Sequence, residues 1–121
     1  MPELAEPVSH YTDAVRAGEL VFVSGCIAVD GHGRLVGGDD VVAQTRQVFA
    51  NVEAILAAAG ASIRDVVKVT VFLTDVRDRA AVNTVREEIF GETRPASTLV
   101  EVSKLVLDGA RVEIEVVAVL A

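Results

Sequence analysis

Residues 41–75 read VVAQTRQVFANVEAILAAAGASIRDVVKVTVFLTD and contain the two patterns from which the fold can be predicted. In the first part, apolar residues recur at the three- and four-residue spacing of an amphipathic helix. Asp39 and Asp40 precede this part as candidate N-caps, and Gly60 follows it at the usual C-cap position. We therefore predict a helix from about residue 40 to about residue 59.

The second part, residues 66–75, predicts a strand because it is rich in β-branched and apolar residues. Successive side chains of a strand point to opposite faces of the sheet. Alternation would therefore separate two sets of side chains: Val67, Val69, Val71 and Leu73 on one face, and Val66, Lys68, Thr70 and Phe72 on the other. Both sets are largely apolar, which indicates an internal strand.

The flanking sequence predicts the remaining elements. Upstream, Glu19 to Asp30 reads as a strand, and Arg34 to Val36 can return beside it after a glycine-rich loop. Downstream, Asp78 can cap a second helix that ends at Phe90 and Gly91. Residues 96–105 and 111–121 predict two further strands, so the order of elements is β(β)βαβαββ.

This order predicts an α+β fold in which two helices cover one face of a mixed sheet, as a single domain over residues 1–121. The other face of the sheet carries many apolar residues, and no helix remains to cover it. A large apolar surface of that kind usually marks an interface. We therefore expect the chain to assemble with copies of itself.

The composition narrows the class of function. The net charge is −7 and no basic stripe is visible, which disfavours nucleic acids and anionic membranes as partners. Cys26 is the single cysteine, so no intrachain disulfide can form, which suits a reducing cytoplasm. The N-terminus lacks the apolar core of a signal peptide, and no apolar run is long enough to span a membrane. We expect a cytoplasmic protein.

Familiar catalytic motifs are absent: the sequence has no phosphate-binding loop, no GxGxxG, no CxxC and no HExxH. The two histidines have no cysteine or histidine nearby, so no metal site is expected. Ser24 and Cys26 are read as small packing residues in preference to nucleophiles. Glu113 and Glu115 are stronger candidates for a functional role, because both carboxylates lie on one face of the last strand. That face is either solvated or forms the rim of a pocket between subunits, and Arg111 on the same face could pair with either carboxylate.

Several segments together resemble the RidA/YjgF family of small enamine and imine deaminases. The resemblance extends from about Ser9 to Ala121, and the matching segments occur in the family's order: HYTDAV, FVSGCIAVD, QTRQVFANVEAILAAAG, VVKVTVFLTD, VN, RPASTLVEV and VEIEVVAV. It implies a chorismate-mutase-like fold, a homotrimer, and three clefts between neighbouring subunits. Active members hydrolyse reactive metabolites such as 2-aminoacrylate to 2-keto acids and ammonia, and they need no metal or organic cofactor.

The resemblance also implies roles for particular residues. Glu113 corresponds to the catalytic glutamate that positions the attacking water. Tyr11, Ser24, Gly25 and Asn83 correspond to residues that shape the substrate cleft. In the family, an arginine after Pro-Ala pairs with the substrate carboxylate, which suits its planar, bidentate guanidinium group.

This chain departs from the family at that arginine, since Pro95-Ala96 is followed by Ser97. It thus resembles an arginine-lacking member of the family. A carboxylate that enters a cleft needs a charged partner, because its burial alone is costly. Arg86 and Arg94 are the candidates for a replacement cation; each could equally be a surface residue.

Two functions therefore stay open. The chain is either a deaminase-type hydrolase with an altered substrate or a trimer that binds a small metabolite and regulates a partner without catalysis. Some family members carry a third label, ribonuclease or translation inhibitor, which the acidic charge and the scarcity of aromatic residues disfavour.

Overall fold

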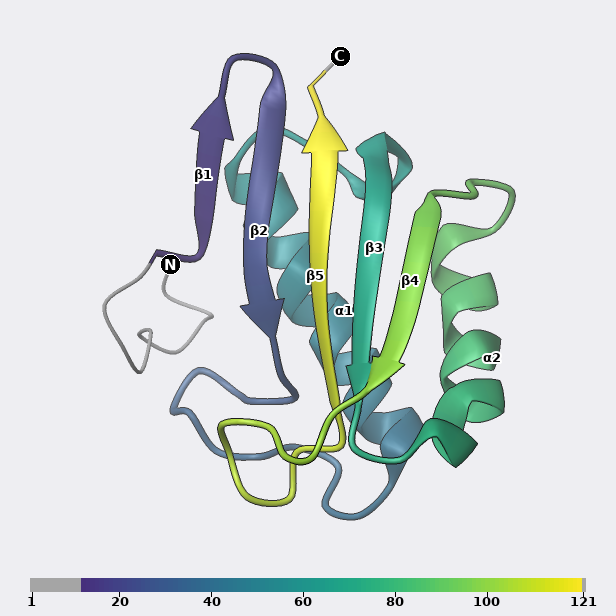
Figure 1. Cartoon of the computed structure of the whole chain (residues 1–121). Helices are drawn as coiled ribbons and strands as arrows, with labels where there is room; N and C mark the ends of the chain where they lie inside the picture. Colours follow the sequence, from purple (N-terminus) through teal and green to yellow (C-terminus); the bar gives the residue numbers. More distant parts are fainter. Residues whose placement is uncertain (1–11, 121) are drawn as a thin grey trace.

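The computed structural model describes residues 12–120 and contains a five-stranded sheet with both helices on one face (Figure 1). The strand order is β1-β2-β5-β3-β4, and every neighbouring pair is antiparallel except β3 and β4, which are parallel. The α+β prediction is thus confirmed. The elements are β1 (Ala14–Ala17), β2 (Leu20–Cys26), α1 (Val41–Ala58), β3 (Val66–Leu73), α2 (Arg79–Phe90), β4 (Ala96–Glu101) and β5 (Val112–Val119).

Helix α1 begins and ends where its local sequence indicates. The Asp40 carboxylate accepts hydrogen bonds from the backbone N–H groups of Val42 and Ala43, as an N-cap does. The helix ends at Ala58, and Gly60 follows with a φ of 84°, a left-handed conformation that favours glycine. None of the helices in residues 12–120 has the length and hydropathy needed to span a bilayer.

The first strands differ from the prediction. The strand expected from Glu19 to Asp30 ends at Cys26, where its register against β5 shifts. The stretch from Arg34 to Val36 forms no strand; it contributes an isolated bridge between Val29 and Leu35. The hairpin partner of β2 is instead β1, which precedes it across a turn at Gly18 with a φ of 62°.

A bulge at the start of β3 changes the predicted faces. Val66 pairs with Ala118 while Lys68 pairs with Val117, so β3 contains one extra residue at this point. Val66, at 3% exposure, therefore shares the buried face with Val69, whereas Val67 is 45% exposed on the open face. Simple alternation assigns these two residues to the opposite faces. Beyond the bulge the alternation holds, with Val69, Val71 and Leu73 fully buried against the helices.

Asp78 does not cap α2 through its side chain as expected. A short 3₁₀ turn (Val76–Asp78) leads into α2, and Asp75 caps that turn by accepting from the Arg77 N–H. Both carboxylate oxygens of Asp78 instead accept hydrogen bonds from Nη2 of Arg111, at 2.9 Å each. This contact joins α2 to the segment that leads into β5.

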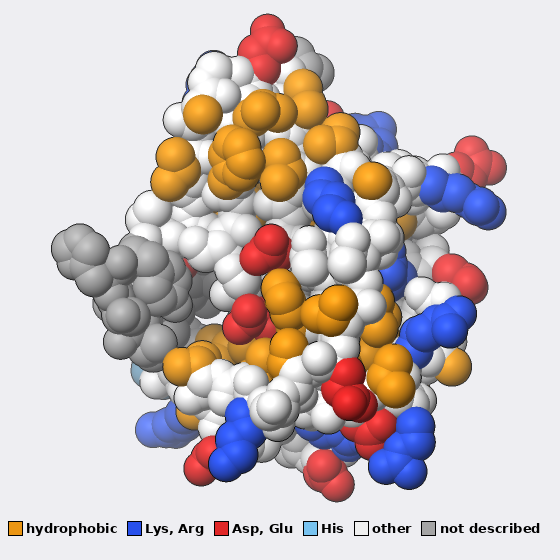
Figure 2. Space-filling model, viewed as in Figure 1, with side chains coloured by type: hydrophobic (Ala, Val, Ile, Leu, Met, Phe, Trp, Pro, Cys, Tyr) orange, Lys and Arg blue, Asp and Glu red, His pale blue; other side chains and the backbone are white. Residues whose placement is uncertain are grey.

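The sheet face opposite the helices is open in the single chain. Figure 2 shows hydrophobic side chains gathered on this face, with acidic and basic groups between them. Its exposed apolar side chains include Val15, Leu20, Phe22, Val67 and Val100. The apolar open face agrees with the sequence-based expectation of a surface that needs a cover.

The Gln44 side chain links α1 by hydrogen bonds to two loops at one end of the sheet. Its side chain is fully buried, and its Nε2 donates to the carbonyl oxygens of Gly38, at 2.7 Å, and Gly109, at 2.9 Å. Its Oε1 accepts from the backbone N–H of Arg111 at 2.8 Å. One side chain thus satisfies three backbone groups from two loops.

We expect Gln44→Ala to lower the free energy of unfolding by about 3 kcal/mol, because each buried polar group left without a partner costs about 1–3 kcal/mol. Urea unfolding followed by circular dichroism measures the change. Glu53→Ala, at an exposed position of the same helix, is the control and should change stability by less than about 0.5 kcal/mol. Equal effects of the two variants would contradict the role given to Gln44.

Candidate functional site

Among residues 12–120, those expected to form the site fall into two groups on opposite faces of the sheet. Glu113 lies between Val112 and Ile114, which are fully buried beneath the helices, so its side chain points to the open face. Ser97 pairs with the buried Val69 and its side chain points to the helix side. One chain alone therefore does not bring Glu113 and Ser97 together.

On the open face, the carboxylate of Glu113 packs against Gly25. A Cβ atom at position 25 would lie 2.6 Å from Oε2 of Glu113. The carboxylate can therefore occupy its observed position only when residue 25 is glycine. Burial raises the pKa of Glu113, and repulsion from Glu115 adds to the shift. Within residues 12–120, no cation lies at ion-pair distance from Glu113. A half-buried carboxyl with a raised pKa is suited to accept and return a proton.

Ser24 and Cys26 flank Gly25 in β2 but are poor nucleophiles. The Ser24 hydroxyl donates to the carbonyl oxygen of Thr12 at 2.6 Å, which ties the segment before β1 to β2. Burial, with a further contribution from Asp13 and Glu113, raises the pKa of the Cys26 thiol to about 12. Such a thiol stays protonated and unreactive near neutral pH, in agreement with the packing role expected for Cys26.

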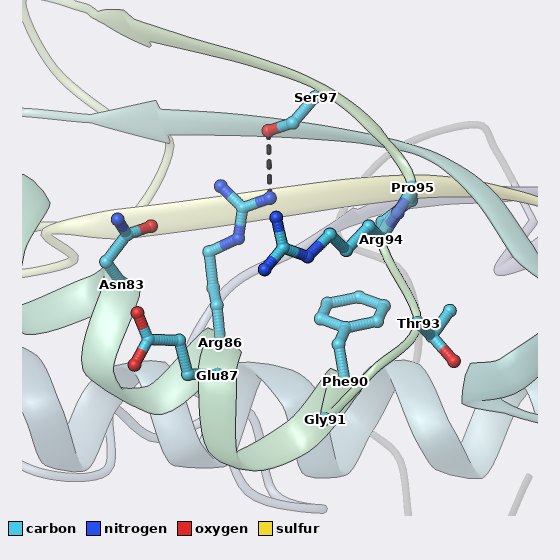
Figure 3. Close-up of a pocket in the computed structure, with 9 residues that line it drawn as sticks. All are labelled: Asn83, Arg86, Glu87, Phe90, Gly91, Thr93, Arg94, Pro95 and Ser97. Carbon is cyan, nitrogen blue, oxygen red and sulfur yellow. Dashed lines mark hydrogen bonds between the residues drawn. The ribbon is translucent and has the colours of Figure 1, made fainter.

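The second group lines a pocket of about 420 Å³ between α2 and the start of β4 (Figure 3). Asn83, Arg86, Arg94 and Ser97, four residues singled out from the sequence, all line it. Nη2 of Arg86 donates a hydrogen bond to Oγ of Ser97 at 2.9 Å. A guanidinium group from the helix thus reaches Ser97, the residue that follows Pro95-Ala96 in the sequence.

Arg86 differs from the arginines that form ion pairs. Arg46, Arg77 and Arg111 each pair with a carboxylate. Within residues 12–120, no carboxylate lies within 4.0 Å of the Arg86 guanidinium, although Glu87 lines the same pocket. Burial lowers the pKa of Arg86, as expected for a half-buried cation without a counter-charge. An anion that entered the pocket would supply that counter-charge.

The sequence left open a pairing of Arg111 with Glu113 or Glu115, and the structure shows neither pair. Its guanidinium group binds Asp78 and Asp39 at the end of the sheet. The reason is that Arg111 precedes β5, so its side chain turns to the loops and not to the open face.

Some pocket residues were not anticipated. Glu87, Phe90 and Thr93 line the pocket beside the expected residues. The helical spacing of Asn83, Arg86, Glu87 and Phe90 places all four on one side of α2, and this signal could have revealed them. Tyr11 lies outside the described residues. Within residues 12–120, no cluster of three or more His, Cys, Asp or Glu side chains could hold a metal ion.

Comparison with known proteins gives one consistent result. The family model described as Endoribonuclease L-PSP matches residues 2–120. A RutC family protein of Pyrococcus horikoshii is 47% identical over 114 residues, covering 93% of this chain and 89% of that protein. The 2-iminobutanoate/2-iminopropanoate deaminase of Salmonella typhimurium is 44% identical over 115 residues, covering 93% and 88%.

Solved structures agree with this result. RidA from the Antarctic bacterium Psychrobacter sp. PAMC 21119 superposes with a TM-score of 0.92 at 38% identity, covering 99% of this chain and 96% of that one. E. coli TdcF with bound serine superposes with a TM-score of 0.91 at 35% identity, covering 100% and 96%. The resemblance noted from the sequence motifs is thus confirmed over nearly the whole chain. This chain belongs to the RidA/YjgF family.

Proposed function

We propose that the chain is a deaminase-type hydrolase that converts a small reactive enamine or imine to the corresponding keto acid and ammonia. It would remove such metabolites in the cytoplasm before they damage other proteins, without a metal or organic cofactor. The observation that carries the proposal is the hydrogen bond between Arg86 and Ser97. It supplies a cation for a substrate carboxylate at the strand position where the family's arginine is absent.

The complete site would form between two copies of the chain. Arg86 and Glu113 lie on opposite faces of the sheet, and the open face that carries Glu113 is apolar and exposed. We propose a homotrimer in which the pocket beside α2 and β4 of one subunit meets the open face of its neighbour. The apolar side chains of that face would then be covered, and each of three clefts would contain both groups.

The proposed mechanism needs one anchor and one acid-base group. Arg86 would bind the substrate carboxylate, while Asn83 and, on the neighbouring copy, Ser24 and Gly25 would shape the cleft. Glu113 of the neighbouring copy would take a proton from water as the water oxygen bonds to the carbon of the protonated imine, whose nitrogen becomes an amine. Glu113 would return that proton to the amine and then take the hydroxyl proton as the C–N bond breaks, with the bonding electrons leaving on nitrogen. Ammonia and the keto acid are released, and the proton left on Glu113 passes to solvent.

Mixing two inactive variants tests both the reaction and the shared site. We expect Arg86→Gln and Glu113→Ala, each alone, to lose ammonia release from 2-aminoacrylate generated in situ. Coexpression of the two chains should restore about a quarter of the wild-type activity, because random assembly leaves about that share of clefts with both groups intact. Ammonia release by the purified mixed oligomer measures the recovery.

A mixture of Glu113→Ala with Gly25→Ala is the matched control. Both substitutions alter the open face, so no cleft in that mixture becomes intact and activity should stay low. Mixed oligomers of Arg86→Gln and Glu113→Ala that recover no activity would contradict the shared site.

The absence of an arginine at position 97 favours one alternative, a trimer that binds a small metabolite and regulates a partner without catalysis. The bound serine in the structure of TdcF shows that this relative holds a small molecule. A metabolite that raises the melting temperature of the wild-type chain by mass action, together with no ammonia release above background, would support this alternative.

A further inference from the structure

The pocket between α2 and β4 carries a distinctive set of charges. Arg86 and Arg94 contribute two guanidinium groups, and Glu87 contributes one carboxylate. Figure 3 shows Asn83 and Glu87 on one side of Arg86 and Arg94 on the other. None of the three charged groups forms an ion pair within residues 12–120. Their charges therefore remain available to a ligand.

The two guanidinium groups are held in different ways. Arg86 is half-buried, and its hydrogen bond to Ser97 fixes the depth at which the group lies. Arg94 is exposed and directly precedes Pro95, which restricts its backbone to extended conformations. Arg86 is thus placed to anchor a carboxylate inside the pocket, and Arg94 to bind a second one nearer the solvent.

We propose that the pocket selects a ligand with two carboxylates and one cationic nitrogen, namely the imine or amine form of an acidic amino acid. Arg86 binds the carboxylate next to the imine carbon, Arg94 binds the side-chain carboxylate, and Glu87 faces the protonated nitrogen. This assignment rests on the proposed function, since it names the substrate class of the same site. A ligand of this class carries one net negative charge and balances the net positive charge of the three side chains.

A phosphate group would fit these contacts less well. The negative charge of a phosphate is concentrated on one group. The two guanidinium groups of the pocket come from different elements, one from α2 and one from the segment before β4. A phosphate would also leave Glu87 facing an anion, which is unfavourable. A ligand with one carboxylate would use Arg86 and leave Arg94 to solvent.

Calorimetric binding to the intact oligomer tests the selection without any turnover. The probes are L-glutamate, L-norvaline, which has the same number of carbons but one carboxylate, and 2-oxoglutarate, which lacks the cationic nitrogen. We expect L-glutamate to bind at least about fivefold more tightly than either of the others, the size expected for one partly exposed charged contact.

Three variants separate the contacts, and a fourth is the control. Arg86→Gln should weaken all three probes, Arg94→Gln should remove only the preference for L-glutamate over L-norvaline, and Glu87→Gln only the preference over 2-oxoglutarate. Arg79→Gln makes the same charge change on α2 outside the pocket and should leave all affinities unchanged.

Several results would overturn the assignment. They are equal affinity of L-norvaline and L-glutamate, inorganic phosphate binding more tightly than L-glutamate, and an unchanged preference in Arg94→Gln. Loss of the oligomer in Arg94→Gln, seen as a lower mass in sedimentation, would also overturn it, since the arginine would then serve an interface. Ammonia release from 2-aminoacrylate is measured separately, so the deaminase proposal can fail or succeed independently of this selection.

Discussion

Glu113→Ala is expected to lower ammonia release from 2-aminoacrylate by about a hundredfold to ten-thousandfold, the range lost with a general acid-base group. Glu113 is the half-buried carboxyl of the open face, and its raised pKa follows first from burial and then from repulsion by Glu115. No other residue on that face offers the same combination within the described chain. The measurement is the initial rate at saturating enamine, compared with the rate without protein.

Stability separates a catalytic role from a structural one. Burial of a carboxylate without a cation is costly, so Glu113→Ala should leave the free energy of unfolding unchanged or raise it. Glu115→Ala is the control, because Glu115 lies on the same strand and the same face but is exposed. We expect that variant to retain most of the activity. If wild type and Glu113→Ala both match the background rate, deamination of 2-aminoacrylate is excluded.

Gly25→Ala is expected to reduce activity about a hundredfold while the chain stays folded, because a displacement of about 1 Å in a reacting group can cost that much. The added Cβ would lie 2.6 Å from Oε2 and 2.8 Å from Cδ of Glu113, too close for either atom to stay. The carboxylate is the end of a flexible side chain and can move away at little cost. Gly25 has no positive φ, so alanine can adopt its backbone conformation.

A double-mutant cycle shows whether Gly25 acts through Glu113. If the glycine serves only to place the carboxylate, Gly25→Ala combined with Glu113→Ala should be no less active than Glu113→Ala alone. Thermal unfolding of all three variants should give melting temperatures close to that of the wild type. An additive loss in the double variant would mean that Gly25 contributes independently of the carboxylate.

The fold was predictable where the information is local. Helix α1 could be read from the Asp40 cap, the apolar spacing and Gly60, all within one segment. In β5, Glu113 and Glu115 share one face as the alternation predicts, and Val112, Ile114 and Val116 are buried on the other. The faces of β3 were wrong at Val66 and Val67, because a bulge depends on the pairing with β5 and leaves no mark in the strand's own sequence.

The sequence suggested residues for the candidate site but not their arrangement. Asn83, Arg86, Arg94 and Ser97 line one pocket, as could be suspected from their identities. Arg111 lies elsewhere, bound to Asp78, which is 33 positions away in the chain. Residues that are distant in sequence meet only when the sheet and helices have packed.

By itself the sequence determined the α+β class, the family and the apolar open face, because each follows from patterns that repeat along the chain or from ordered motifs. Only the tertiary structure decided that Arg86 reaches Ser97 and that Glu113 lies on the opposite face of the sheet. The reason is physical. Whether Arg86 reaches Ser97 depends on the distance between α2 and β4, and the face on which Glu113 lies depends on strand register. Long-range packing sets both.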